Sequence, residues 1–136
     1  MDDLITFLRA RLDEDEQAAR DASADVWRKS ERPSIWVSCE DGPVAQTKYF
    51  EDAAHIARHD PARVLREVEA KRRMLDLHAR DHACVEHVRA GGDSAPGTMI
   101  YANDWWVEYP GPPCLVVRLL ALPYSYDADY KAEWKP

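Results

Sequence analysis

The chain has 136 residues, of which 46% are hydrophobic and 32% are charged, and its formal net charge is −7. This composition is typical of a single globular domain, which we expect to span residues 1–136. The acidic balance argues against a general nucleic-acid-binding protein, because such proteins need a cationic surface. The best candidate for a membrane segment, residues 115–122, is too short and is interrupted by Arg118.

The N-terminus and the cysteine count indicate the compartment. The opening MDDLITFLRAR is amphipathic and begins with acidic residues, so it is unlike a secretory signal. Three cysteines are an odd number for a disulfide framework. We therefore expect a cytoplasmic protein with free thiols that binds neither membranes nor nucleic acid.

Residues 2–26 are predicted to form one long amphipathic helix. Its apolar residues recur at helical spacing along one face, which should be buried. They are Leu4, Ile5, Leu8, Leu12, Ala19, Ala22 and Val26. The opposite face carries the acidic run 13–16, which is typical of a solvated surface.

A β-hairpin is predicted next. The segment SIWVSC (34–39) has the two-residue alternation of a half-buried strand. Asp41-Gly42 is typical of a tight turn, and VAQTKYF supplies β-branched and aromatic residues for the returning strand. Cys39, beside the turn, is expected to be a small buried hydrophobic residue.

Two helices are predicted after the hairpin, over 51–59 and from Asp60 to about 81. Asp60 stands where an N-cap belongs and Pro61 at the first helical position. The second helix mixes basic and acidic residues, which predicts salt bridges, potentially with the acidic first helix. Its apolar stripe, expected to pack against Leu4, Leu8 and Leu12, comprises Val64, Leu65, Val68 and Leu75.

The remaining chain predicts two short strands and a helix. TMIY and WWVEY are typical of strands around a turn at 103–104, and CLVVRLLAL of a short helix ended by Pro123. In the tail we expect one turn capped by Asp127 and anchored by Trp134. The predicted architecture is α+β, with long amphipathic helices packed on a small antiparallel sheet.

Histidines and cysteines gather at the end of the long helix. His78 and His82 continue its apolar face, where an imidazole needs a hydrogen-bond partner or a metal. Four Cys or His ligands at tetrahedral corners would make a zinc site, provided that the helix ends near 81 and the chain bends back. The expected ligands are His78, Cys84, His87 and Cys114, with His82 as an alternate. The competing interpretation is core-edge histidines and buried thiols, because no CxxC pair is present.

A second histidine pair, His55 and His59, has the four-residue spacing that points two imidazoles the same way along a helix. The motif HIARH lacks the glutamate of HExxH and therefore the base of a metalloprotease. Its expected role is structural, at the junction before Pro61. No glycine-rich phosphate loop and no GxSxG elbow occur in the sequence.

Three blocks resemble, in order, a family of small actinobacterial and actinophage proteins catalogued as domain of unknown function 6221. They are LITFLRARLDEDEQAAR, the run from EDAAHIARHDPAR to MLDLH, and CLVVRLLALPYSYDADYKAEWKP. The resemblance covers nearly the whole chain. It implies that His78, Cys84 and Cys114 fall where members hold potential metal ligands, although this chain lacks a CxxC there. The family carries no established activity.

Two functions follow from these residues. The first is a small interaction or regulatory module with a protein partner and a structural zinc ion, rather than an enzyme. The alternative is a thiol-dependent enzyme or redox sensor that uses Cys84 with His82 or His87. The lack of phosphate, nucleotide and acid-pair motifs favours the first function, and the neighbouring acidic residues Asp81 and Glu86 oppose activation of the Cys84 thiol.

Overall fold

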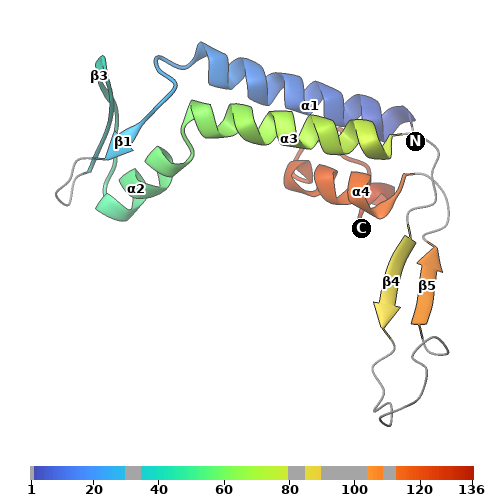
Figure 1. Cartoon of the computed structure of the whole chain (residues 1–136). Helices are drawn as coiled ribbons and strands as arrows, with labels where there is room; N and C mark the ends of the chain where they lie inside the picture. Colours follow the sequence, from blue (N-terminus) through green and yellow to red (C-terminus); the bar gives the residue numbers. More distant parts are fainter. Residues whose placement is uncertain (1, 30–34, 80–84, 90–103, 109–112) are drawn as a thin grey trace, which may run out of the picture. The chain divides into compact units, whose positions relative to one another are not determined.

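The computed structural model describes residues 2–29, 35–79, 85–89, 104–108 and 113–136 (Figure 1). The chain divides into two compact units. We call Thr6–Met74 the sheet unit, and Met1–Ile5 with Leu75–Pro136 the terminal unit. The helices and the antiparallel sheet make an α+β fold, as the sequence predicts. The expectation of a single domain over residues 1–136 stays a prediction.

Helix α1 (Asp2–Asp21) buries the predicted apolar face. The buried members of that face are Leu4, Ile5, Leu8, Leu12 and Ala19. The helix ends at Asp21, five residues before the predicted end, and Val26 is 48% exposed. Ser23 and Asp25 favour turns over helix interiors, and the Asp25 carbonyl accepts the Ala62 N–H at 2.8 Å. That carbonyl therefore accepts a hydrogen bond from the first turn of the helix that begins at Pro61.

The three-stranded antiparallel sheet has the order β1-β2-β3. The predicted hairpin is confirmed as β2 (Trp36–Cys39) and β3 (Gly42–Gln46), and Gly42 has a φ of +126°, which favours glycine. The prediction extended the second strand to residue 50 and was too long. Strand β1 (Arg28–Lys29) was not predicted, because two residues show no periodicity.

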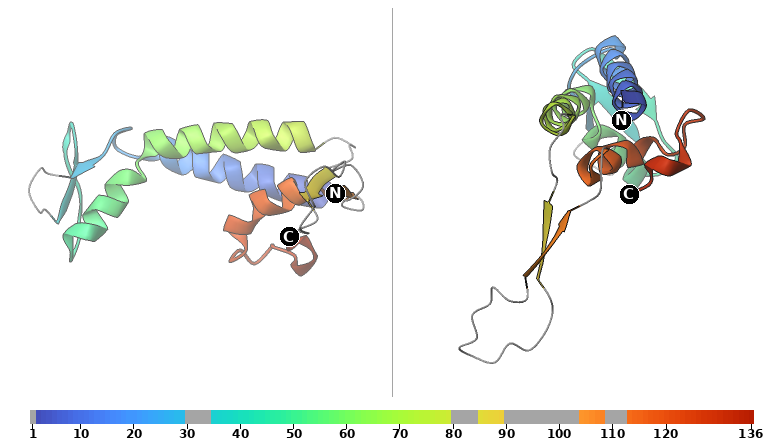
Figure 2. Two further views of the ribbon diagram at one scale, coloured as in Figure 1. Left: turned by 60° about the horizontal axis from the view of Figure 1, so that its bottom comes forward. Right: turned by 90° about the vertical axis from the view of Figure 1, so that its right-hand side faces the viewer.

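Helix α2 (Phe50–Arg58) packs against β1 and β2 (Figure 2). Ala53 on the helix and Val37 in β2 are fully buried, so this small interface has a dry centre. Among the described residues, the main helix contacts with the sheet come from the short α2. The two long helices instead run side by side within the sheet unit (Figures 1 and 2).

Helix α3 (Pro61–His78) begins at the predicted cap. The Arg63 N–H donates to the Asp60 carboxylate at 2.8 Å, which satisfies one of the free donors of the first turn. Val68 and Leu75 are buried, but Val64 and Leu65 are only partly buried, contrary to prediction. Leu65 lies about 60° around the helix from Val68 and so borders the stripe instead of centring it.

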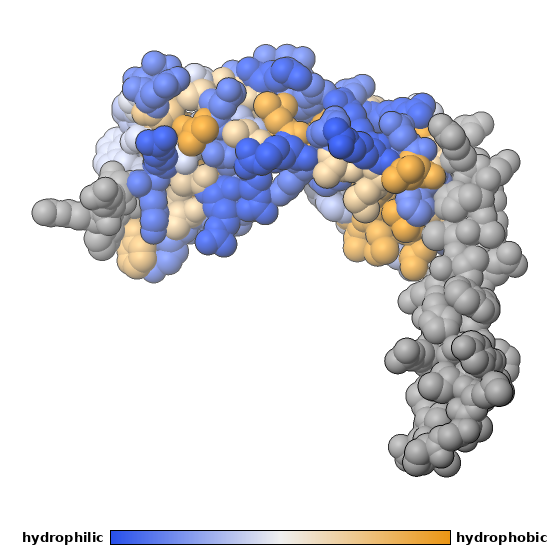
Figure 3. Space-filling model, viewed as in Figure 1, coloured by the Kyte–Doolittle hydropathy of each residue, from blue (hydrophilic) through white to orange (hydrophobic). Residues whose placement is uncertain are grey.

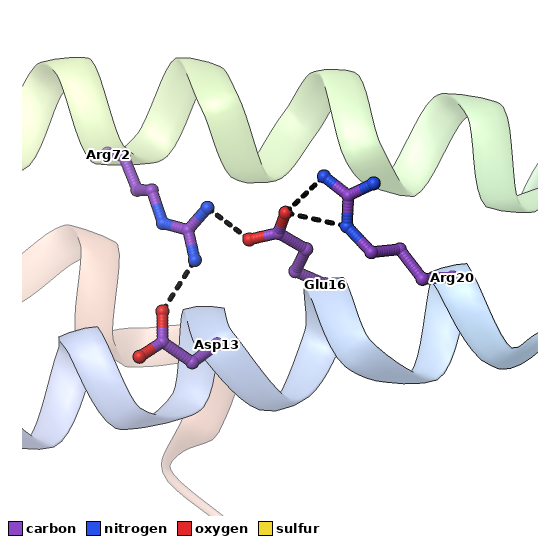
Figure 4. A network of polar contacts seen from close by, with 4 residues as sticks. All are labelled: Asp13, Glu16, Arg20 and Arg72. Atoms are coloured by element: carbon purple, nitrogen blue, oxygen red, sulfur yellow. Dashed lines mark hydrogen bonds and ion pairs between the residues drawn. The ribbon is translucent and has the colours of Figure 1, made fainter.

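An ion-pair network joins α1 to α3 within the sheet unit (Figure 4). The Arg72 guanidinium donates to Asp13 at 2.5 Å and also to Glu16, which in turn accepts from Arg20 at 2.8 Å. The acidic run was predicted to be a solvated face, whereas two of its members pair with a cation on α3. The other expectation, that the salt-bridged helix α3 lies against the acidic first helix, is therefore confirmed.

The terminal unit contains α4 (Leu115–Ala121), the 3-10 turns Leu122–Tyr124 and Ala132–Trp134, and the ribbon of β4 (Val85–Arg89) and β5 (Asp104–Glu108). Its buried side chains come from both ends of the chain. They are Leu4, Ile5, Leu75, Cys114, Val117, Ala121, Tyr124 and Trp134. At its surface, Lys131 forms an ion pair of 2.7 Å with Asp3.

The predictions for this unit have mixed outcomes. The helix before Pro123 and the burial of Trp134 are confirmed. The turn capped by Asp127 is also confirmed, because its carboxylate accepts the Asp129 N–H at 2.9 Å and its carbonyl accepts the Tyr130 N–H at 3.1 Å. WWVEY supplies β5, but its partner is β4, and TMIY lies outside the described residues. Among the helices of the described residues, none has the length and apolarity needed to cross a bilayer.

Candidate metal centre

His78 and Cys114 meet in the terminal unit. They are 36 positions apart in sequence, and Nδ1 of His78 lies 3.6 Å from Sγ of Cys114. His78 is the last residue of α3, and Cys114 is the residue just before α4. The thiol is buried, with 6% of the residue exposed. The structure thus brings together two side chains that the sequence predicted as ligands of one ion.

Local chain geometry places both side chains. His78 follows the buried Leu75 by three residues, so the two residues share a face of α3. The Cys114 carbonyl accepts the Arg118 N–H at 3.2 Å, as an N-cap carbonyl does. The Arg118 side chain in turn donates to the Pro113 carbonyl at 3.0 Å. These two bonds fix the backbone on both sides of the thiol.

The separation of the two atoms fits two kinds of chemistry. A sulfur and a nitrogen bound to one tetrahedral zinc ion, at about 2.3 Å and 2.0–2.1 Å, lie roughly 3.6 Å apart. The observed 3.6 Å also fits a thiol that donates a weak hydrogen bond to the ring nitrogen. The same separation of sulfur and nitrogen is therefore expected for two ligands of one zinc ion and for a buried thiol that is hydrogen-bonded to an imidazole.

The side chains of the other predicted ligands lie outside the part of the chain that the structure describes. Cys84 and the alternate His82 lie outside the described residues. His87 lies in β4, where its backbone faces Trp106 of β5. Within the described residues, no group of three or more His, Cys, Asp or Glu side chains is placed to hold a metal ion. Two of the four predicted ligands are thus together, and the full set stays a prediction.

The sequence match extends over the whole chain, because a family model covers residues 1–136. The chain belongs to the family of unknown function DUF6221. Searches among curated proteins and among solved structures gave no match. DUF6221 membership confirms the family that the sequence resembles, whereas the actinobacterial or actinophage origin stays a prediction. The family supplies no activity, so the chemistry of this chain has to be argued from its own residues.

Cys39 differs from its prediction as a buried hydrophobic residue. It is partly exposed and lines a groove of about 570 Å³ in the sheet unit. The charged lining residues are of both signs: Arg28 and Lys29 against Asp25 and Glu40. These charges balance, so the groove favours neither an anion nor a cation, and no sequence pattern predicts it.

Proposed function

We propose that this DUF6221 chain is a small interaction module whose terminal unit is stabilised by a structural zinc ion. His78 and Cys114 provide two of its ligands. The observation that carries the proposal is the 3.6 Å separation of Nδ1 and Sγ, which equals the distance expected across a tetrahedral zinc ion. Cys84 and His87 are the remaining ligands that the sequence predicts.

Burial favours a structural over a catalytic role. A catalytic zinc ion keeps one coordination position open to substrate, whereas a structural ion is enclosed by protein ligands. Cys114 is 6% exposed and lies among the buried residues of the terminal unit. The same burial weighs against thiol chemistry at Cys114, because a reactive thiolate must reach its substrate.

The positions of the two residues suggest what the ion would do. His78 ends α3 and Cys114 precedes α4, so a shared ion would join two helices that are separated by a long stretch of chain. A structural zinc ion contributes its binding free energy to folding, because the unfolded chain has no preformed site. Zinc would thereby hold the base of the β4–β5 ribbon to the helices of this unit.

The outer face of α4 supports a role in protein interaction. Leu119 and Leu122 are 48% and 46% exposed, and the nearby Tyr126 is 84% exposed. Leu119 lies on the side of the helix opposite the buried Val117 and Ala121, and Leu122 and Tyr126 follow the end of the helix. Figure 3 shows hydrophobic residues gathered at this part of the surface. Apolar patches of this kind are typical of protein–protein contact surfaces.

The test is the zinc content of the purified chain, measured by elemental analysis together with three variants. We expect about one zinc ion per wild-type chain, and loss of zinc in both Cys114→Ser and His78→Gln. Cys39→Ser is the matched control, because it removes a thiol from the sheet unit and should keep the zinc. A folded wild-type chain that stays metal-free after expression with added zinc would contradict the proposal.

A further inference from the structure

A second cluster of metal-ligating side chains lies on α2 in the sheet unit. His55 is in the last turn of this helix and His59 is its C-cap residue. Both side chains are exposed, and their ring centroids are 4.4 Å apart with an interplanar angle of 41°. The two rings therefore lie beside each other at the surface, well within reach of one ion.

The helix end fixes the orientation of the His59 ring. The His59 N–H donates to Ile56, three residues back, at 3.0 Å, so the last turn is tightened. The His55 carbonyl, which would accept this N–H in a regular α-helix, is instead 2.8 Å from Nδ1 of His59. A carbonyl only accepts, so Nδ1 carries the proton and Nε2 presents a free lone pair.

This arrangement is the one that metal-binding histidines usually adopt. The ring nitrogen that does not bind the metal donates to a backbone carbonyl, which sets the tautomer and the direction of the other nitrogen. Two imidazoles bound at about 2.0–2.1 Å on adjacent positions of an octahedral or square-planar ion, about 90° apart, have ring centres roughly 4.5 Å apart. The observed 4.4 Å agrees with that geometry before any ion is added.

The charges carried by α2 itself do not oppose a cation. Glu51 and Asp52 lie in the first turn of α2, about one turn before His55, and both are exposed. Arg58 in the last turn contributes one positive charge against these two carboxylates. The net local charge of the helix is thus favourable for a divalent ion.

We propose that His55 and His59 form a surface site for a divalent transition-metal ion, separate from the His78–Cys114 centre. Imidazole nitrogens suit Ni²⁺, Cu²⁺ and Zn²⁺. The protein supplies two ligands and water fills the other positions, so the ion exchanges with solvent rather than being retained as a structural ion is. The site does not depend on the zinc proposal, because the two sites share no residue.

The test is calorimetric titration of Ni²⁺ into the full chain as purified. We expect one exchangeable site in the wild type and at least about tenfold weaker binding in His55→Gln and in His59→Gln. Cys39 lies in neither proposed site, so Cys39→Ser should leave this binding unchanged. The zinc content of the same preparations is measured separately, so a failure of this proposal is distinguished from a failure of the zinc proposal.

A register control keeps the number of histidines constant. In the double variant Asp52→His with His55→Gln, the two histidines of α2 stand seven residues apart, about 10.5 Å along the axis. They are too far apart to share an ion, so Ni²⁺ should bind as weakly as in His55→Gln alone. Binding at wild-type strength in this variant, or in the variant lacking both His55 and His59, would overturn the proposal.

Discussion

Arg72 on α3 and Asp13 on α1 are 59 positions apart in sequence, yet a guanidinium nitrogen of the first lies 2.5 Å from a carboxylate oxygen of the second. The same guanidinium binds Glu16, one turn further along α1 (Figure 4). A lone surface ion pair contributes little to stability, but a network with a forked guanidinium has better geometry. The network therefore pairs the polar edges of two helices whose apolar faces are buried.

The network predicts a pH-dependent stability. Hydrogen bonds from Arg20 and then from Arg72 hold the pKa of Glu16 below its ordinary value of 4.5. A carboxylate with a lowered folded-state pKa stabilises the fold above its unfolded-state pKa, and this contribution disappears as the pH falls through the folded-state pKa. Glu16→Gln should therefore lower the urea midpoint at pH 7, and its difference from wild type should shrink steadily below pH 4.5.

Glu14→Gln is the control for that experiment. Glu14 pairs with Arg11 within α1 and does not join the two helices, so its loss should change the urea midpoint less. Added salt should narrow the gap between the two variants, because exposed charges are screened. If Glu14→Gln and Glu16→Gln lower the urea midpoint equally at every pH, the contact between Glu16 and Arg72 contributes nothing to stability.

The N-cap of α3 gives a second prediction. Asp60→Ala removes the acceptor of the Arg63 N–H and should destabilise the protein by about 0.5–2 kcal/mol, measured by urea unfolding. Asp60→Asn retains a side-chain oxygen and should recover most of the loss. If Asp60→Asn is as unstable as Asp60→Ala, the side chain does not act as a cap.

A third prediction contrasts two leucines on α3. Leu75 is 1% exposed and Leu77 is 73% exposed, although they are two residues apart. Leu75→Ala should cost about 2–5 kcal/mol of unfolding free energy, because it leaves a cavity. Leu77→Ala should stay within about 0.5 kcal/mol of wild type, as surface changes usually do. Similar losses for both variants would show that the burial is assigned to the wrong face.

Much of the helical fold could be predicted from periodicity and caps. The stripe of α1 and the Asp60-Pro61 start of α3 both rest on local rules, and both are confirmed. The end of α1 was predicted five residues too late, because the apolar spacing continues to Val26, whereas the Asp25 carbonyl accepts a hydrogen bond from the distant Ala62. Strand β1 was missed for a similar reason, since its pairing with β2 depends on tertiary contact.

The candidate site was predicted in part. His78 continues the stripe that ends at Leu75, so its inward position follows from helical spacing. That Cys114 would reach Nδ1 of His78 could not follow from spacing, because the approach depends on how α4 packs in the terminal unit. The orientation of the His59 ring could not be predicted either, because the tightened last turn that frees the His55 carbonyl has no signature in the sequence.

X-ray absorption at the zinc edge of the purified chain identifies the atoms that bind the ion. We expect a first shell that contains sulfur at about 2.3 Å and nitrogen at about 2.0–2.1 Å. The zinc-edge signal should be lost in Cys114→Ser, together with the zinc, and its sulfur shell should stay unchanged in Cys39→Ser. A zinc shell of oxygen and nitrogen alone, or a sulfur shell unaffected by Cys114→Ser, would contradict a zinc ion held by His78 and Cys114.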